Sequence, residues 1–208
     1  MPTFDDLCFT NRIWIVAYVS PTAAAPLYLI WYTDTDEAET DRLLTFQTGE
    51  IAAIPALRDL PTVLAKHLDA LRPADRLRRW LAELAHHEPV VSATYDLRAV
   101  ERALQLRRLS GKALEALVSF VNLFGDFVGQ DERNSDLALY WRSEPLEEAW
   151  YYFYDYFFWP RFRNTTQYQT RSRPAPQFDC GQVADALRQL RQQFEQRLRV
   201  VTTGAREA

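Results

Sequence analysis

Residues 12–33 read RIWIVAYVSPTAAAPLYLIWYT, and this stretch decides the fold class. It contains two runs rich in β-branched and aromatic residues, 12–19 and 27–33, separated by a segment that Pro21 and Pro26 bound. Because proline cannot donate to a strand ladder, the pattern predicts two strands joined by a loop. Both predicted strands are apolar on both faces. One face must therefore be covered, and we expect helices from later in the chain to cover it.

Two further apolar runs, 43–47 and 50–54, flank Thr48 and Gly49 and predict a short hairpin. From Pro61 onward the apolar period becomes helical. Helices are expected over 62–71 and 74–87, after caps at Asp96 and Ser110, over 146–159, and over 179–201. The predicted fold class is α+β, with an N-terminal antiparallel β-meander of about three to four strands packed by about five or six helices.

The length and composition fit one domain with a core of ordinary size. The chain has 208 residues, of which 48% are hydrophobic. We expect a single compact domain over 1–208, β-rich over 1–58 and helical over 59–201, with a frayed tail over 202–208. The polar stretch 163–177 is expected to be a long loop.

The two cysteines and the start of the chain predict a compartment. Cys8 and Cys180 form no CxxC pair, and the first residues contain no secretory signal pattern. No apolar run approaches the length of a membrane span. These features predict free thiols and a cytoplasmic protein without a membrane partner.

The net charge of -4 hides a gradient along the chain. Residues 1–50 carry eight acids and two bases, whereas residues 151–208 carry five acids and nine bases. This asymmetry predicts an acidic face near one end and a basic face near the other. Because the total charge is acidic, a general role in nucleic-acid binding is not expected.

Several catalytic motifs are missing from the sequence. It contains no GxSxG, no GxxxxGK[ST] and no GxGxxG, and only six glycines. The three histidines, His67, His86 and His87, belong to no HExxH pattern. The sequence therefore predicts no catalytic residue, no cofactor and no metal ion.

An acidic run lies after the second predicted strand. Its members are Asp34, Asp36, Glu37, Glu39 and Asp41. Such a run is typical of a solvated loop, and it could also attract a basic protein or hold a metal ion. The glycine and glutamate that a calcium loop requires at later positions are absent.

An aromatic block, WYYFYDYFFW, occupies residues 150–159, and thirteen of the 28 aromatic residues fall between Tyr140 and Tyr168. Two interpretations stay open: core and edge packing, or an exposed recognition surface, since Tyr and Trp are enriched at binding hot spots. The candidate partner-binding residues in the block are Trp150, Tyr151, Tyr154, Asp155 and Trp159.

Residues 113–128 read ALEALVSFVNLFGDFV. The arrangement of Leu117, Phe120, Asn122, Leu123 and Asp126 resembles a helix of small bacterial immunity proteins that neutralise polymorphic or contact-delivered toxins. The resemblance implies a non-enzymatic cytoplasmic binder. From their spacing alone, Asn122 and Asp126 are expected to pair with each other or with backbone groups.

Together these features predict a non-enzymatic protein that binds another protein. An immunity or inhibitor protein that occludes a basic toxin domain is the form that the resemblance implies. Two alternatives remain: a small-molecule enzyme with an aromatic-lined pocket that uses Asp155 or a histidine, and a structural or oligomerisation module. The sequence leaves the oligomeric state open.

Overall fold

The computed structural model describes residues 3–35, 39–163, 168 and 172–204. Its strands are β1 (Ile13–Val19), β2 (Leu27–Asp34), β3 (Thr40–Leu43), β4 (Thr45–Phe46), β5 (Ile51–Ile54), β6 (Leu71–Arg72), β7 (Ala93–Asp96) and β8 (Leu198–Val200). Its longer helices are α1 (Phe4–Asn11), α2 (Leu60–His67), α3 (Ala74–Leu84), α4 (Leu97–Gln105), α5 (Gly111–Gly129), α7 (Glu144–Phe153) and α10 (Cys180–Glu195). The shorter α6 (Ala138–Trp141) precedes α7, and a π-helical turn (Tyr154–Phe158) joins α7 to α8 (Trp159–Arg163).

The strands form one mixed sheet with the order β6-β4-β5-β2-β1-β7. β3 pairs with β2, and β8 pairs with β5. The pairs β1–β2, β2–β3, β2–β5 and β4–β5 are antiparallel, but β1–β7 and β5–β8 are parallel. The predicted α+β class is confirmed. The sheet is more complex than an N-terminal meander, because short strands from later in the chain add to it.

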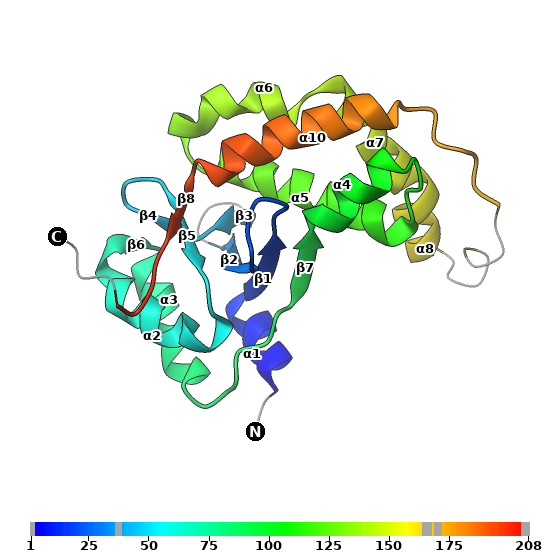
Figure 1. Cartoon of the computed structure of the whole chain (residues 1–208). Helices are drawn as coiled ribbons and strands as arrows, with labels where there is room; N and C mark the ends of the chain where they lie inside the picture. The colour runs from blue at the N-terminus through cyan, green and yellow to red at the C-terminus, as the bar shows by residue number, and fades with distance from the viewer. Residues whose placement is uncertain (1–2, 36–38, 164–167, 169–171, 205–208) are drawn as a thin grey trace.

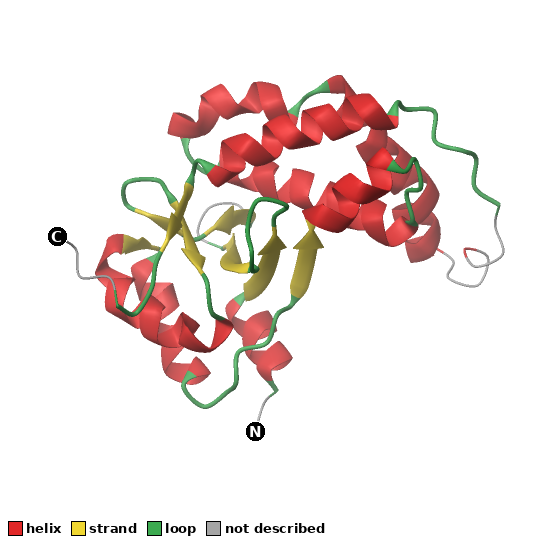
Figure 2. Ribbon diagram, viewed as in Figure 1, coloured by secondary structure: helices red, strands yellow, loops and turns green. Residues whose placement is uncertain are grey.

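Each face of the sheet carries its own apolar core, because side chains alternate along the strands. Ile15, Ile30 and Ile54 face α1, α2 and α3, whereas Tyr18 and Leu29 face the later helices. Figure 1 shows α1–α3 on one side of the sheet and α4, α5 and α10 on the other, and Figure 2 shows the same layers by element type. The two-sided apolar character of β1 and β2 thus has a direct cause: both faces are covered.

Several predicted boundaries differ from the structure. α1 lies before the first predicted strand, where Thr3 and Asp6 form a capping box. β6, β7 and β8 come from residues 59–201, for which the sequence pattern predicted helices. These strands have two to four residues, too few to show a period of two, and pairing with neighbours in the sheet stabilises them.

The predicted caps at Asp96, Ser110 and Asp179 are confirmed, since each side chain accepts a hydrogen bond from the first turn of its helix. Cys8 is buried and Cys180 is half-buried, and both are free thiols. None of the helices that the structure describes combines the length and apolar character that a membrane crossing requires. The predicted loop over 163–177 and the predicted tail over 202–208 lie partly outside the described residues.

A half-buried ion network fixes α10 to its neighbours. Arg191 pairs with Glu101 of α4 and with Glu195 of its own helix, each at 3.0 Å. Glu195 also accepts hydrogen bonds from Tyr18 of β1, at 3.0 Å, and from Ser20. These contacts connect α10, α4 and the sheet, and so hold the layer in which the site described below is found.

Candidate functional site

The described members of the acidic run have partners within the chain. Asp34 pairs with Arg42 at 3.3 Å, and Glu39 pairs with Arg12 at 3.0 Å. The Asp41 carboxylate accepts a hydrogen bond from the Thr33 hydroxyl at 2.7 Å. The remaining two members, Asp36 and Glu37, lie outside the described residues. Intramolecular pairs therefore compensate the charges of Asp34 and Glu39, and Asp41 belongs to β3 rather than to a loop.

The aromatic block divides between core and surface. Phe153 is 7% exposed and belongs to the core. On the outer side, Tyr151 is 60% exposed, Trp159 43% and Phe162 78%. The rings of Phe158 and Phe162 stack at 6.3 Å, and Trp159 contacts both. We call the residues Phe158, Trp159 and Phe162 the aromatic patch. Both interpretations of the block apply, each to different residues.

Two of the predicted residues, Trp150 and Tyr154, turn toward α5 and meet at Asn122. The Trp150 indole Nε1 donates to Asn122 Oδ1 at 2.8 Å, and Asn122 Nδ2 donates to the Tyr154 hydroxyl at 3.2 Å. The two aromatic rings lie 4.1 Å apart. Asp155, which follows Tyr154 directly in the sequence, is exposed instead. The expectation that Asn122 pairs with Asp126 or with the backbone is wrong. Its amide forms hydrogen bonds with the side chains of Trp150 of α7 and Tyr154 of the π-helical turn instead.

An open cavity of about 460 Å³ lies beside Asn122, between α5, the sheet and α6. It is lined by Trp31, Asp41, Tyr95, Ser119, Asn122, Leu123, Gly125, Asp126, Trp141 and Tyr154. We call it the Asp126 cavity. The strand pattern explains how the sheet residues reach it: Trp31 lies opposite Leu43 in the ladder, and Asp41 points to the same face of β3 as the buried Leu43. Tyr95 reaches it from β7.

Asp126 has an unusual carboxyl group. Its Oδ2 accepts a hydrogen bond from the Trp31 indole Nε1 at 3.0 Å. Burial raises the pKa of Asp126 to about 6, the Trp31 bond acts in the opposite direction, and the charge of Asp41 raises the pKa further. Burial and the Asp126 charge raise the pKa of Tyr95 to about 12. The cavity therefore concentrates negative charge in partly desolvated surroundings.

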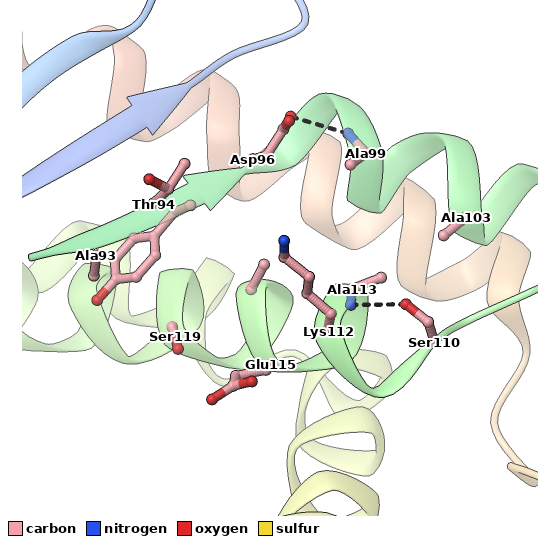
Figure 3. Close-up of a pocket in the computed structure, with 12 residues that line it drawn as sticks. Ala93, Thr94, Asp96, Ala99, Ala103, Ser110, Lys112, Ala113, Glu115 and Ser119 are labelled. Carbon is pink, nitrogen blue, oxygen red and sulfur yellow. Dashed lines mark hydrogen bonds between the residues drawn. The ribbon is translucent and has the colours of Figure 1, made fainter. Parts of the chain in front are cut away.

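A second hollow, of about 670 Å³, runs along β7. It is lined by Ala93, Thr94, Tyr95, Asp96, Ala99, Ala103, Ser110, Lys112, Ala113, Glu115, Ala116 and Ser119. We call it the β7 groove. Figure 3 shows β7 and α4 forming one side of it and α5 the other, with Lys112 and Ser119 rising from α5. Its walls carry four alanines from α4 and α5, so backbone can approach closely.

One polar stripe of α5 connects the hollows. Its polar residues recur at spacings of three and four, so they lie on one side of a helix whose other side is core. They are Lys112, Glu115, Ser119, Asn122 and Asp126. The β7 groove and the Asp126 cavity share Tyr95 and Ser119. The sequence alone did not indicate this site. The signal was the polar stripe in an otherwise apolar helix, but only the fold shows what faces it.

Comparison with known proteins finds a solved structure of similar fold. No protein-family model matches the chain, and no curated protein matches it. One solved structure, titled "The crystal structure of SatS c-terminal domain in complex with bromine", has a TM-score of 0.58 and 18% sequence identity to this chain. The match covers 94% of this chain and 97% of that one. This chain is therefore similar in fold to the SatS C-terminal domain over nearly the full length of both.

Proposed function

We propose that this protein binds another protein, and that it takes an extended segment of that partner into the β7 groove. The observation that carries the proposal is that β7 is the last strand of the sheet within the described part of the chain, and that its residues line a groove. An exposed strand edge presents unpaired N–H and C=O groups, to which a partner strand can add.

The ladder indicates which groups are available. The Ser92 N–H donates to the Ile15 carbonyl at 2.8 Å, on the β1 side of β7. Because successive residues of a strand direct their backbone groups to opposite sides, the N–H groups of Ala93 and Tyr95 point away from β1. The alanines of α4 and α5 leave room there for a segment of chain.

The aromatic patch, which lies next to one end of the β7 groove, supports the same function. A third hollow, of about 410 Å³, is lined by Lys112 and Glu115 together with Phe157 and Phe158. It shares Lys112 and Glu115 with the β7 groove. Clustered exposed aromatic side chains mark interaction sites. A partner segment leaving the groove along α5 would meet the patch.

Strand addition can be tested with a peptide selected from a random library on the immobilised protein. Its dissociation constant is measured for the wild type, Ala93→Pro and Ala93→Ser. Proline removes one outward N–H at a strand edge, where it is tolerated, whereas serine keeps that group. We expect Ala93→Pro to weaken binding about tenfold and Ala93→Ser to leave it unchanged. Amide exchange of Tyr95 should slow when peptide is bound. Equal affinity of all three proteins would refute strand addition.

The immunity interpretation remains a prediction. Of the residues that carry the resemblance, Leu117, Phe120 and Leu123 are core residues, and Asn122 and Asp126 line the Asp126 cavity. A toxin partner would be supported by inhibition of a toxin by this protein in a purified assay.

A small-molecule enzyme is the second candidate, and one observation favours it. Asp126 is a carboxyl group with a pKa of about 6 in a cavity lined by aromatic rings, and such a group can act as a general acid or base near neutral pH. Turnover of a substrate by the wild type and its loss in Asp126→Asn would support this candidate. The sequence-based choice of Asp155 for that role does not fit its exposed position.

A further inference from the structure

The Asp126 cavity contains two carboxylates without a compensating cation. Asp41 and Asp126 both line it, and the charge of Asp41 contributes to the raised pKa of Asp126. Among the described residues, neither carboxylate forms an ion pair with Lys, Arg or His. The nearest base in sequence to Asp41, Arg42, pairs with Asp34. A ligand that brings positive charge into the cavity would relieve this imbalance.

The walls of the cavity suit an organic cation. Trp31, Trp141 and Tyr154 contribute three aromatic rings. The electron-rich faces of such rings attract ammonium groups, most strongly where water is partly excluded. The Asn122 amide forms hydrogen bonds with Trp150 and Tyr154, and these bonds fix the position of the Tyr154 ring at the cavity.

The rings are held in place without a ligand. The Trp31 ring packs on Trp14 at a centroid distance of 5.0 Å, and its Nε1 is bonded to Asp126. The Trp141 ring lies against α5 at Gly125, where a Cβ would meet the ring at 2.6 Å. Preorganised walls reduce the entropy lost on binding, so even a small cation can be held.

From this geometry we infer that the Asp126 cavity is a binding site for an alkylammonium group, with Asp126 and Asp41 as counter-charges and Trp31, Trp141 and Tyr154 as the aromatic walls.

Other ligand classes fit less well. An anion would be repelled by the two carboxylates. A bare metal ion prefers several oxygen, nitrogen or sulfur ligands, and the described residues include no group of three His, Cys, Asp or Glu side chains that could hold one. A neutral sugar would also stack on the rings, but it would leave the carboxylate charges uncompensated.

The alkylammonium group could come from a free amine or from a lysine side chain. The lysine source rests on the proposed function, because the cavity shares Tyr95 and Ser119 with the β7 groove. A backbone segment on β7 could then place a lysine side chain beside Asp126. The free-amine source does not need the groove.

The first experiment titrates the protein with n-butylammonium chloride at pH 8 and uses 1-butanol as the neutral control. Tryptophan fluorescence and the NMR resonance of the Trp31 indole N–H report on the cavity. We expect saturable binding of n-butylammonium only. Asp126→Asn, which keeps an acceptor for Trp31, should weaken binding about tenfold, and Asp41→Asn should weaken it less. Asp136→Asn removes an exposed carboxylate elsewhere and should have no effect. The Trp31 indole resonance also shows whether each variant keeps the native cavity.

Absence of saturable binding, equal binding of 1-butanol, or unchanged affinity in Asp126→Asn would each overturn the inference. These results would leave the Ala93→Pro experiment unaffected, so the two proposals fail independently.

The second experiment distinguishes the sources with N-acetyl-lysine N-methylamide. If the source is a lysine side chain, this probe should bind about tenfold more tightly than n-butylammonium, and Ala93→Pro should remove the advantage. If the source is a free amine, the backbone groups should give no advantage, and Ala93→Pro should change neither affinity. Both results support an alkylammonium site.

Discussion

The indole ring of Trp141 lies so close to the backbone of α5 at Gly125 that a Cβ on residue 125 would be 2.6 Å from it. Glycine is otherwise a poor choice for the interior of a helix. This contact explains its presence, because any larger side chain would displace the ring that forms one wall of the Asp126 cavity.

Gly125→Ala should therefore lower the free energy of unfolding by about 1–3 kcal/mol, since overpacking forces the ring to move. Gly129→Ala is the matched control on the same helix, because a Cβ there would meet nothing within 4 Å. The control should be neutral or stabilise the fold by about 0.5–1 kcal/mol. Urea denaturation measures both variants. Equal effects would show that the Trp141 contact is not tight.

The carboxyl group of Asp126 should make stability depend on pH. Its folded-state pKa of about 6 lies above the ordinary value for aspartate, so the folded state holds the proton more firmly than the unfolded state does. Its contribution to stability is therefore complete below about pH 4 and is lost as pH rises through about 6. Asp126→Asn stays neutral, and it should equal the wild type at pH 4 and exceed it by about 2 kcal/mol at pH 8. Urea denaturation at both values checks this, and a constant difference would contradict it.

Arg191 should matter far more than its neighbour Arg188. The Arg191 side chain is 6% exposed, and its loss would leave Glu101 and Glu195 half-buried without a counter-charge. Arg191→Met should cost about 3 kcal/mol of stability. Arg188, on the same helix, makes an exposed pair with Asp185, so Arg188→Met should cost less than about 1 kcal/mol. Thermal and urea unfolding compare the two variants, and similar losses would argue against the buried network.

The aromatic block offers a direct test of its division between core and surface. Phe153→Ser replaces a core side chain and should cost more than about 3 kcal/mol. Phe162→Ser replaces a side chain that is 78% exposed and should change stability by less than about 0.5 kcal/mol. If the aromatic patch contacts the partner, Phe162→Ser should also weaken binding of the selected peptide. A large stability loss in Phe162→Ser would place that ring in a packed environment.

The sequence predicted those elements that local patterns specify. The apolar runs gave β1 and β2, and the caps Asp96, Ser110 and Asp179 gave the starts of three helices. The pattern could not give β3, whose residues Thr40–Leu43 are mostly polar and form a strand because β2 offers a partner. α1 was missed although Thr3 and Asp6 carried the signal of a capping box.

The candidate site could not be predicted from local sequence patterns, because its contacts join residues that are far apart in the sequence. Asp126 receives its hydrogen bond from Trp31, which is 95 residues away, and Asn122 receives one from Trp150, which is 28 residues away. Spacing along α5 placed Asn122 and Asp126 near each other, but not the aromatic side chains that approach from other elements. The sequence left open whether the aromatic block is core or surface. Of its candidate partner-binding residues, Tyr151 and Trp159 are exposed, whereas Trp150 and Tyr154 turn inward.

The pairing of β8 with β5 has a consequence for how the chain folds. Ile51 lies beside Leu198, so a strand formed from the first quarter of the chain gains its parallel neighbour only when residue 198 has been synthesised. Contacts of such separation are slow to form. During translation one side of β5 would therefore stay exposed to other chains until residues 198–200 have been synthesised. The nascent chain would depend on rapid synthesis of the residues between β5 and β8, or on protection of the open edge of β5, to avoid aggregation.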